Sequence, residues 1–169
     1  MKFSFKTLAS ALVLSASALA AAAGPTSIAP GVAVAGQLRE ADLSGLKAQG
    51  YTTIVDQRPD GEAADQPSSA LMAAAARAQG LRFSYIPVRP GAIPDTAVEE
   101  LRAALAANPQ GVLIYCRSGS RAARTWGLAE AARPDGPDAA TILAAIRAAG
   151  QSGDDLAEAL AQRIAGRPR

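Results

Sequence analysis

The sequence contains no histidine and only one cysteine among its 169 residues. The absence of histidine excludes a Ser-His-Asp triad, a Cys-His dyad and any metal site with histidine ligands. A single cysteine cannot form a disulfide within the chain, so Cys116 is a free thiol, an intermolecular partner or a reactive centre. Any catalysis must therefore use Cys116, carboxylates, arginines, hydroxyls and backbone amides.

The chain also lacks a basic run and any interleaving of basic with aromatic side chains, so nucleic acid is not predicted as a partner. Two of the 17 basic residues, Lys2 and Lys6, lie in the first stretch, and the remainder equal the 15 acidic residues in number. No apolar run long enough to span a membrane follows residue 23. We therefore predict no nucleic-acid binding and no stable membrane insertion of the mature protein.

Residues 1–23 have the layout of a secretory signal peptide. Lys2 and Lys6 precede an apolar stretch of small residues, and A-x-A-like cleavage sites end at Ala20 and Ala23. An N-terminal membrane anchor is the alternative, although the apolar run is short for a spanning helix. The sequence thus predicts an exported, periplasmic protein with a signal peptide over 1–23, a linker over 24–30 and one domain over 31–169.

Apolar and amphipathic segments alternate along the rest of the chain. We predict strands at 32–36, 52–57, 81–88 and 111–116, and helices at 40–50, 68–80, 97–107, 120–132, 138–149 and 154–165. Thr96 and Glu99 have the spacing of a capping box at the start of the third helix. This alternation predicts a single α/β domain whose central, mostly parallel sheet is flanked by helices. Ligands bind such sheets beyond the carboxyl ends of the strands, where Cys116 lies.

The segment after Cys116 has the composition of an anion-binding loop. Arg117, Ser118, Gly119 and Ser120 separate the cysteine from Arg121, and a helix begins within this segment. Such a loop offers converging backbone N–H groups and the positive end of the helix dipole. We predict Cys116 as the nucleophile, Arg121 as the anion-binding catalytic residue, and residues 117–120 as substrate-binding.

Here the sequence resembles a known family. The segment "YCRSGSRAARTW" is similar to the active loop of the phosphatase-like domain of beta-lactamase-hydrolase-like proteins, also described as a sulfurtransferase family. Further similar blocks occur in the same order: "VAVAGQL" (32–38), "TIVDQRPDGE" (53–62), "QPSSA" (66–70), "YIPVRPGAI" (85–93) and "ILAAIRAAG" (142–150). The resemblance implies the fold of dual-specificity, tyrosine-phosphatase-like proteins.

The loop departs from the pattern of protein tyrosine phosphatases in two ways. Tyr115 stands where those enzymes have histidine, and Arg121 lies five positions after the cysteine rather than six. The spacing C-x-x-G-x-R instead resembles single-domain rhodaneses. We therefore rank first a rhodanese-like sulfurtransferase acting through a persulfide on Cys116, because a shorter loop favours a persulfide sulfur or a small anion.

Two alternatives stay open. The first is a phosphatase that hydrolyses phosphate monoesters through a phosphocysteine, with Asp95 as the acid that protonates the leaving alcohol. The second is a non-catalytic module that binds anions or thiols with the same loop. All three hypotheses require a small anionic or persulfide ligand, and none of them requires a metal or another cofactor.

Overall fold

The computed structural model describes residues 24–168, so the predicted signal peptide lies outside the described residues. Strands and helices alternate over most of this range, as the sequence predicts. The elements are β1 (Thr26–Ala29), β2 (Val32–Ala35), α1 (Asp42–Ala48), β3 (Thr53–Asp56), α2 (Ser69–Ala78), β4 (Arg82–Tyr85), α3 (Asp95–Ala107), β5 (Val112–Tyr115), α4 (Ser120–Ala132), α5 (Ala139–Ala148), the 3₁₀ turn η1 (Asp154–Leu156) and α6 (Ala157–Ala165).

The five strands form one sheet in the order β1-β2-β5-β3-β4. Strand β5 lies in the middle and pairs in parallel with β2 on one side and β3 on the other. Its four residues are fully apolar or aromatic and all are buried, as expected for a central parallel strand. The parallel strands β2, β5, β3 and β4 therefore end at one edge of the sheet, and the chain leaves β5 there through Cys116.

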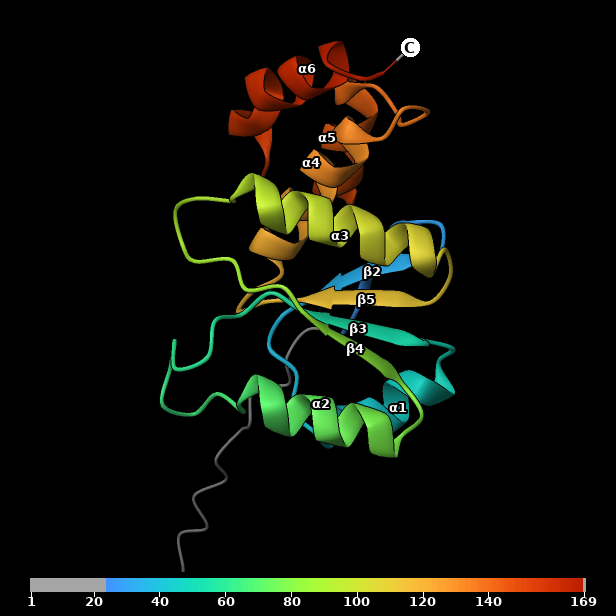
Figure 1. The fold of residues 1–169 in the computed structure, drawn as a ribbon, viewed down its shortest axis with the longest axis vertical. Coiled ribbons are helices and arrows are strands. Elements are labelled where there is room, and N and C mark those ends of the chain that lie inside the picture. Colours follow the sequence, from blue (N-terminus) through green and yellow to red (C-terminus); the bar gives the residue numbers. More distant parts are fainter. Residues whose placement is uncertain (1–23, 169) are drawn as a thin grey trace, which may run out of the picture.

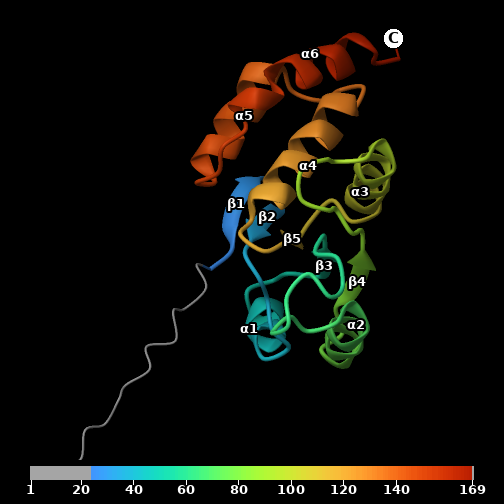
Figure 2. The ribbon, with the colours of Figure 1, turned by 90° about the vertical axis from the view of Figure 1, so that its left-hand side faces the viewer.

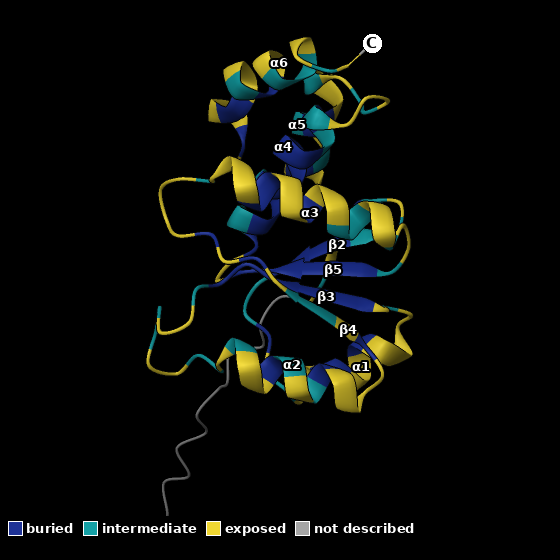
Figure 3. Cartoon of the chain, viewed as in Figure 1, coloured by how far each residue is buried: buried dark blue, intermediate teal, exposed yellow. Residues whose placement is uncertain are grey.

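Helices cover both faces of the sheet (Figure 1). Helices α1 and α2 pack on one face around an apolar cluster that includes Leu43, Ile54 and Met72. Helices α3 and α4 pack on the other face over a second cluster that includes Val55, Ile114 and Trp126. Burial follows this layering, since the central strands β2, β5 and β3 are buried, whereas the outer helix surfaces are exposed (Figure 3). Cys116 belongs to the second cluster, so its side chain faces α4.

The last two helices extend the layer on the α4 side of the sheet. Figure 2 shows α5 and α6 against α4 and remote from α1 and α2. Eight residues of α4 are buried, including the small residue Gly127, whose Cα lies under Ile142 and Ile146 of α5. A Cβ at Gly127 would lie 2.9 Å from Ile146 Cδ1, so a small residue permits the close packing of α4 and α5. Arg167, which follows α6, donates hydrogen bonds to the Glu130 and Ala131 carbonyls at the end of α4, while Asp155 just before α6 pairs with Arg124 nearer the start of α4.

Two sequence predictions are wrong in detail. Residues 24–30 are not merely a linker, because Thr26–Ala29 form β1, which pairs antiparallel with β2 at the edge of the sheet. Thr96 and Glu99 do not form a capping box, since α3 begins earlier, at Asp95, and has no side-chain cap. Pro94 occupies the cap position, which needs no N–H donor, and Glu99 pairs with Arg102 instead. No helix within residues 24–168 has the length and apolar character to cross a membrane.

Candidate active site

The predicted site residues Cys116, Arg117, Ser118, Gly119, Ser120 and Arg121 form one turn between β5 and α4. We call residues 116–121 the Cys116 loop. Gly119 occupies a left-handed conformation with φ of 89°, which a residue with a side chain adopts only with strain. This conformation turns the chain from the strand into the helix within three residues. The glycine that the sequence placed in the loop is therefore required by its geometry.

Two carbonyl groups of the Cys116 loop accept hydrogen bonds from neighbouring segments of the chain. Gln37 N–H donates to the Arg117 carbonyl at 3.2 Å, and the Gln151 side chain donates to the Ser118 carbonyl at 3.3 Å. The amides behave differently: among the described residues, no acceptor pairs with the backbone N–H groups of residues 117, 118 and 120–122. A loop whose carbonyls are engaged and whose amides remain free, at the start of a helix, stabilises an anion.

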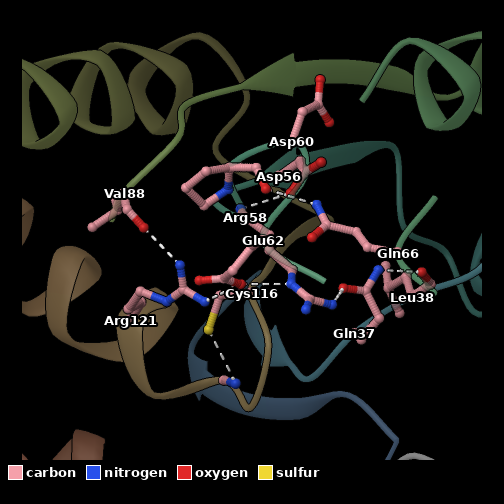
Figure 4. A network of polar contacts seen from close by, with 12 residues as sticks. Gln37, Leu38, Asp56, Arg58, Asp60, Glu62, Gln66, Val88, Cys116 and Arg121 are labelled. Carbon is pink, nitrogen blue, oxygen red and sulfur yellow. Dashed lines mark hydrogen bonds and ion pairs between the residues drawn. The ribbon is translucent and has the colours of Figure 1, made fainter. Parts of the chain in front are cut away.

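Cys116 lies at the base of this loop. Its side chain is fully buried, and its Sγ accepts a hydrogen bond from the Gly119 N–H at 3.2 Å. A donor aimed at the sulfur favours the thiolate, which is the nucleophilic form of cysteine. Figure 4 shows the sulfur turned toward this part of the loop, with Arg121 nearby. The structure thus brings together the two residues that the sequence predicted as nucleophile and anion-binding arginine.

Arg121 is held in a fixed position by two acceptors. Its Nη1 donates to the Val88 carbonyl at 2.6 Å, and its Nη2 donates to Glu62 Oε2 at 2.9 Å. A guanidinium has five N–H groups, so three remain for an anion in the pocket. The side chain is only 14 % exposed, which limits the alternative orientations it can take. Arg121 is therefore preorganised beside the Cys116 loop.

Glu62 is a site residue that sequence reasoning missed. Its Oε2 accepts hydrogen bonds from Arg58 Nε at 2.6 Å and from Arg121 at 2.9 Å (Figure 4). Burial alone would raise the pKa of Glu62, but the hydrogen bonds from the two arginines outweigh it and lower the pKa below its usual value. Glu62 is therefore a carboxylate at neutral pH and orients Arg121. The only sequence signal was its place in the loop after a predicted strand.

The loop that carries Glu62 is anchored along its length. The Arg58 N–H donates to Asp56 Oδ1 at 2.8 Å, and the Gln66 side chain donates to the Pro59 carbonyl at 2.9 Å. Asp60 accepts two hydrogen bonds from Ser69, at 2.7 and 2.6 Å, at the start of α2. The Arg58 guanidinium also donates to Gln37, which follows β2. These bonds connect the ends of β2 and β3 to Arg121 through Glu62.

Asp56 lies beneath this network and has an unusual ionisation. Burial raises its pKa to about 6, and the nearby Asp60 charge adds to this, although hydrogen bonds from Arg58 N–H and Tyr115 oppose it. Burial, together with the neighbouring Asp56 charge, also raises the pKa of Tyr115, so this phenol stays neutral beside Asp56. The residue that replaces the phosphatase histidine is thus a structural partner of Asp56.

We expect Asp56 to make stability fall as pH rises. Because its pKa is higher in the folded state than the ordinary 3.8, the folded state favours the protonated carboxyl. Its contribution is full below about pH 4 and is lost as the pH passes about 6, a change of about 3 kcal/mol. Urea unfolding of the wild type and Asp56→Asn across this range measures it: the stability of the variant relative to the wild type should rise with pH. A difference that stays constant contradicts the assignment.

Asp95, the predicted general acid, lies at the first residue of α3. Its side chain is 82 % exposed, and its carboxylate forms an ion pair with Arg163 of α6. Asp95 does not line the pocket above the Cys116 loop, whereas Arg163 does. Asp95 therefore lies outside the pocket and contacts it through Arg163, which lines the pocket. Its role as an acid stays a prediction.

A pocket of about 630 Å³ opens above the Cys116 loop. Its walls are the loop itself, the first turns of α4, the segment 89–93 between β4 and α3, and α6. Ser118, Ser120 and Arg121 line it from the loop, and among residues 24–168 Glu62 is the only carboxylate that lines it. Its volume lies in the range of pockets that hold small-molecule ligands. The described residues contain no group of three or more side chains of the kinds that would hold a metal ion.

A single α/β domain with a cysteine at the base of a strand–loop–helix turn, and an arginine beside it, defines a phosphatase-like, cysteine-based protein. The sequence profile of the family "Beta-lactamase hydrolase-like protein, phosphatase-like domain" matches residues 25–133. The chain belongs to this family, which confirms the resemblance and the fold expected from the sequence.

Curated relatives share this domain within longer chains. Beta-lactamase hydrolase-like proteins of Xylella fastidiosa (strain Temecula1) and Agrobacterium fabrum (strain C58) are 33 % and 35 % identical to it over 99 and 98 residues. Those matches cover 59 % and 58 % of this chain but only 23 % of each relative. The chain therefore corresponds to about a quarter of the length of these relatives.

Solved structures agree with the fold. A candidate phosphatase from Neisseria meningitidis Z2491 superposes with a TM-score of 0.68 and 29 % identity, covering 81 % of this chain and 96 % of that one. The protein Tk-PTP in its active form superposes with a TM-score of 0.66 at 15 % identity, covering 85 % of this chain and 97 % of that one, and supports the fold alone. These comparisons favour the phosphatase alternative over sulfur transfer, which the sequence ranked first and which they do not support.

Proposed function

We propose that this protein is a cysteine-dependent phosphatase that hydrolyses a phosphate monoester through a phosphocysteine on Cys116. The observation that carries the proposal is the position of Cys116 Sγ, 3.2 Å from the Gly119 N–H, at the base of a loop with free amides. A phosphoryl group above the sulfur would be surrounded by these amides and by Arg121. Such preorganised donors stabilise the charge that develops on the equatorial oxygens.

The reaction takes two steps. The Cys116 thiolate forms a bond to phosphorus while the bond to the ester oxygen breaks, and the leaving oxygen takes a proton from an acid. Water then attacks the phosphocysteine, releasing inorganic phosphate and the thiolate. The free N–H groups of Arg121 and the loop hold the phosphoryl oxygens in both steps.

Asp95 is the proposed proton donor in the first step. It reaches the pocket through its ion pair with Arg163, whereas Glu62 is unsuited because its Oε2 is bound by both Arg58 and Arg121 and it orients Arg121. An aryl phosphate needs less protonation of its leaving group than an alkyl phosphate does. p-Nitrophenyl phosphate is therefore the first substrate to test.

Sulfur transfer is the second candidate, and one feature favours it. The five-residue spacing from Cys116 to Arg121 is that of rhodaneses, and the single lining carboxylate is already bound by arginines. The Cys116 thiolate would attack the outer sulfur of thiosulfate, forming a persulfide and releasing sulfite, so no acid is needed. A thiol would then accept the sulfur.

Intact-mass spectrometry after rapid acid quench separates these functions. The protein is incubated with p-nitrophenyl phosphate or with thiosulfate, and the adduct on Cys116 is measured. We expect a gain of about 80 Da with the ester, as for a phosphocysteine, together with release of phosphate. A gain of about 32 Da with thiosulfate and none with the ester replaces the proposal by sulfur transfer. Anion binding without adduct or turnover with either compound leaves only the binding module.

A further inference from the structure

The pocket above the Cys116 loop contains more positive charge than one reacting phosphate requires. Five of its lining residues are arginines, at positions 89, 117, 121, 124 and 163, against the single carboxylate of Glu62. Arg121 binds Glu62, which Arg58 also binds, so one negative charge faces two guanidinium groups. The pocket is therefore positively charged even before the free loop amides are considered.

The five arginines differ in their partners. Arg124 forms a two-pronged ion pair with Asp155, at 2.7 and 2.6 Å, and Arg163 pairs with Asp95. Arg89 and Arg117 have no carboxylate partner among the described residues, and both are exposed to the solvent of the pocket. Residues 1–23 contain no aspartate or glutamate that might neutralise them. These two guanidinium groups are free to bind an anion.

The pocket is also longer than a phosphoryl group. Along α4 it is lined by residues between Ser120 and Leu128, and the eight steps from the first to the last extend about 12 Å. Ser120 and Arg121 mark the reacting end, while Leu128 lies with Leu156 and Ala159 at an apolar end. Arg117 directly follows Cys116, and Arg89 directly follows Val88, whose carbonyl holds Arg121. The two unpaired arginines therefore border the reacting end from two different segments of the chain.

We propose that Arg89 and Arg117 form a second anion subsite, so that the substrate carries two separate anionic groups joined by a short, partly apolar body. One group reacts in the Cys116 loop and the other is held by Arg89 and Arg117. This inference rests on the proposed function, since it names the substrate class for the same site. It accounts for the excess of arginine at the reacting end of the pocket.

The test compares two substrates whose leaving groups are primary alcohols on the same five-carbon chain, pentyl phosphate and the bisphosphate of pentane-1,5-diol. Wild-type protein should have a kcat/KM at least about tenfold higher for the bisphosphate, as expected for charge-assisted hydrogen bonds to a second anion. Arg89→Gln should reduce this preference about tenfold or more. Arg77→Gln, an exposed arginine of α2 on the other side of the sheet, is the matched control and should retain it. Equal losses for both substrates in Arg89→Gln overturn the subsite and indicate only general attraction of anions.

Calorimetry separates this inference from the proposed function. The pair of ligands is pentyl phosphonate and the bisphosphonate of pentane, neither of which can be hydrolysed. Tighter binding of the bisphosphonate, lost in Arg89→Gln and kept in Arg77→Gln, supports the subsite even if no ester is turned over. Equal affinity for the two phosphonates overturns the subsite, even if p-nitrophenyl phosphate is hydrolysed through Cys116.

Discussion

Replacing Cys116 by serine should lower kcat/KM for p-nitrophenyl phosphate by about 10⁴-fold or more, since removal of a covalent nucleophile has effects of this order. A serine hydroxyl has nearly the same shape but stays protonated, and no histidine in the chain can remove its proton. The free loop amides and Arg121 remain in place, so inorganic phosphate should still bind. Steady-state rates and phosphate titration measure the two effects separately.

A matched control is available in the same sheet. Thr53 is a buried residue at the start of β3, away from the strand ends that carry the site. Its hydroxyl has no hydrogen-bond partner among the described residues. Thr53→Ser should fold and turn over substrate like the wild type. If Cys116→Ser keeps a tenth or more of the activity, Cys116 is not the nucleophile, under phosphate or sulfur chemistry alike.

The second large effect is expected for Arg121→Lys. The guanidinium bonds the Val88 carbonyl and Glu62 at once and still offers N–H groups to the anion. A lysine ammonium keeps the charge but cannot span both acceptors and the phosphoryl oxygens. We expect kcat/KM to fall by about 10²- to 10³-fold, as on loss of a preorganised oxyanion donor.

Two further variants show whether the fall in kcat/KM comes from the lost orientation of the Arg121 guanidinium. Glu62→Gln keeps the Arg121 guanidinium but removes the charge that orients it, and should lower kcat/KM less, by about tenfold. Arg102→Lys, an exposed arginine paired with Glu99 on α3, should have no effect. A result in which Arg121→Lys retains wild-type kcat/KM would show that Arg121 supplies only charge.

The strand–loop–helix turn could be predicted because its determinants are local. Residues 112–115 form an apolar run typical of a buried strand, and Gly119 supplies the left-handed conformation before α4. The parallel sheet followed from the alternation of elements. The capping box was wrong although its residues fit the pattern, because Pro94 already allows α3 to begin before Thr96.

The edge strand β1 could not be predicted for a different reason. Its four residues lie between Pro25 and Pro30 and have no strong strand pattern of their own. They form a strand because the free edge of β2 offers backbone hydrogen bonds. The choice between sulfur and phosphate was equally beyond the sequence, since the loop spacing alone points to rhodaneses whereas the family and the similar structures favour a phosphatase.

The sequence by itself determined the family, and it predicted the nucleophile and the anion-binding loop, because these depend on residue types within a few positions of one another. Only the tertiary structure decided what surrounds the loop. Glu62 reaches Arg121 across 59 positions of sequence, and Arg163 reaches Asp95 across 68. Such pairs form because the ends of the parallel strands meet at one edge of the sheet and α6 packs beside α4 there. The charge balance of the pocket, and with it the expected second anion of the substrate, arises from that packing.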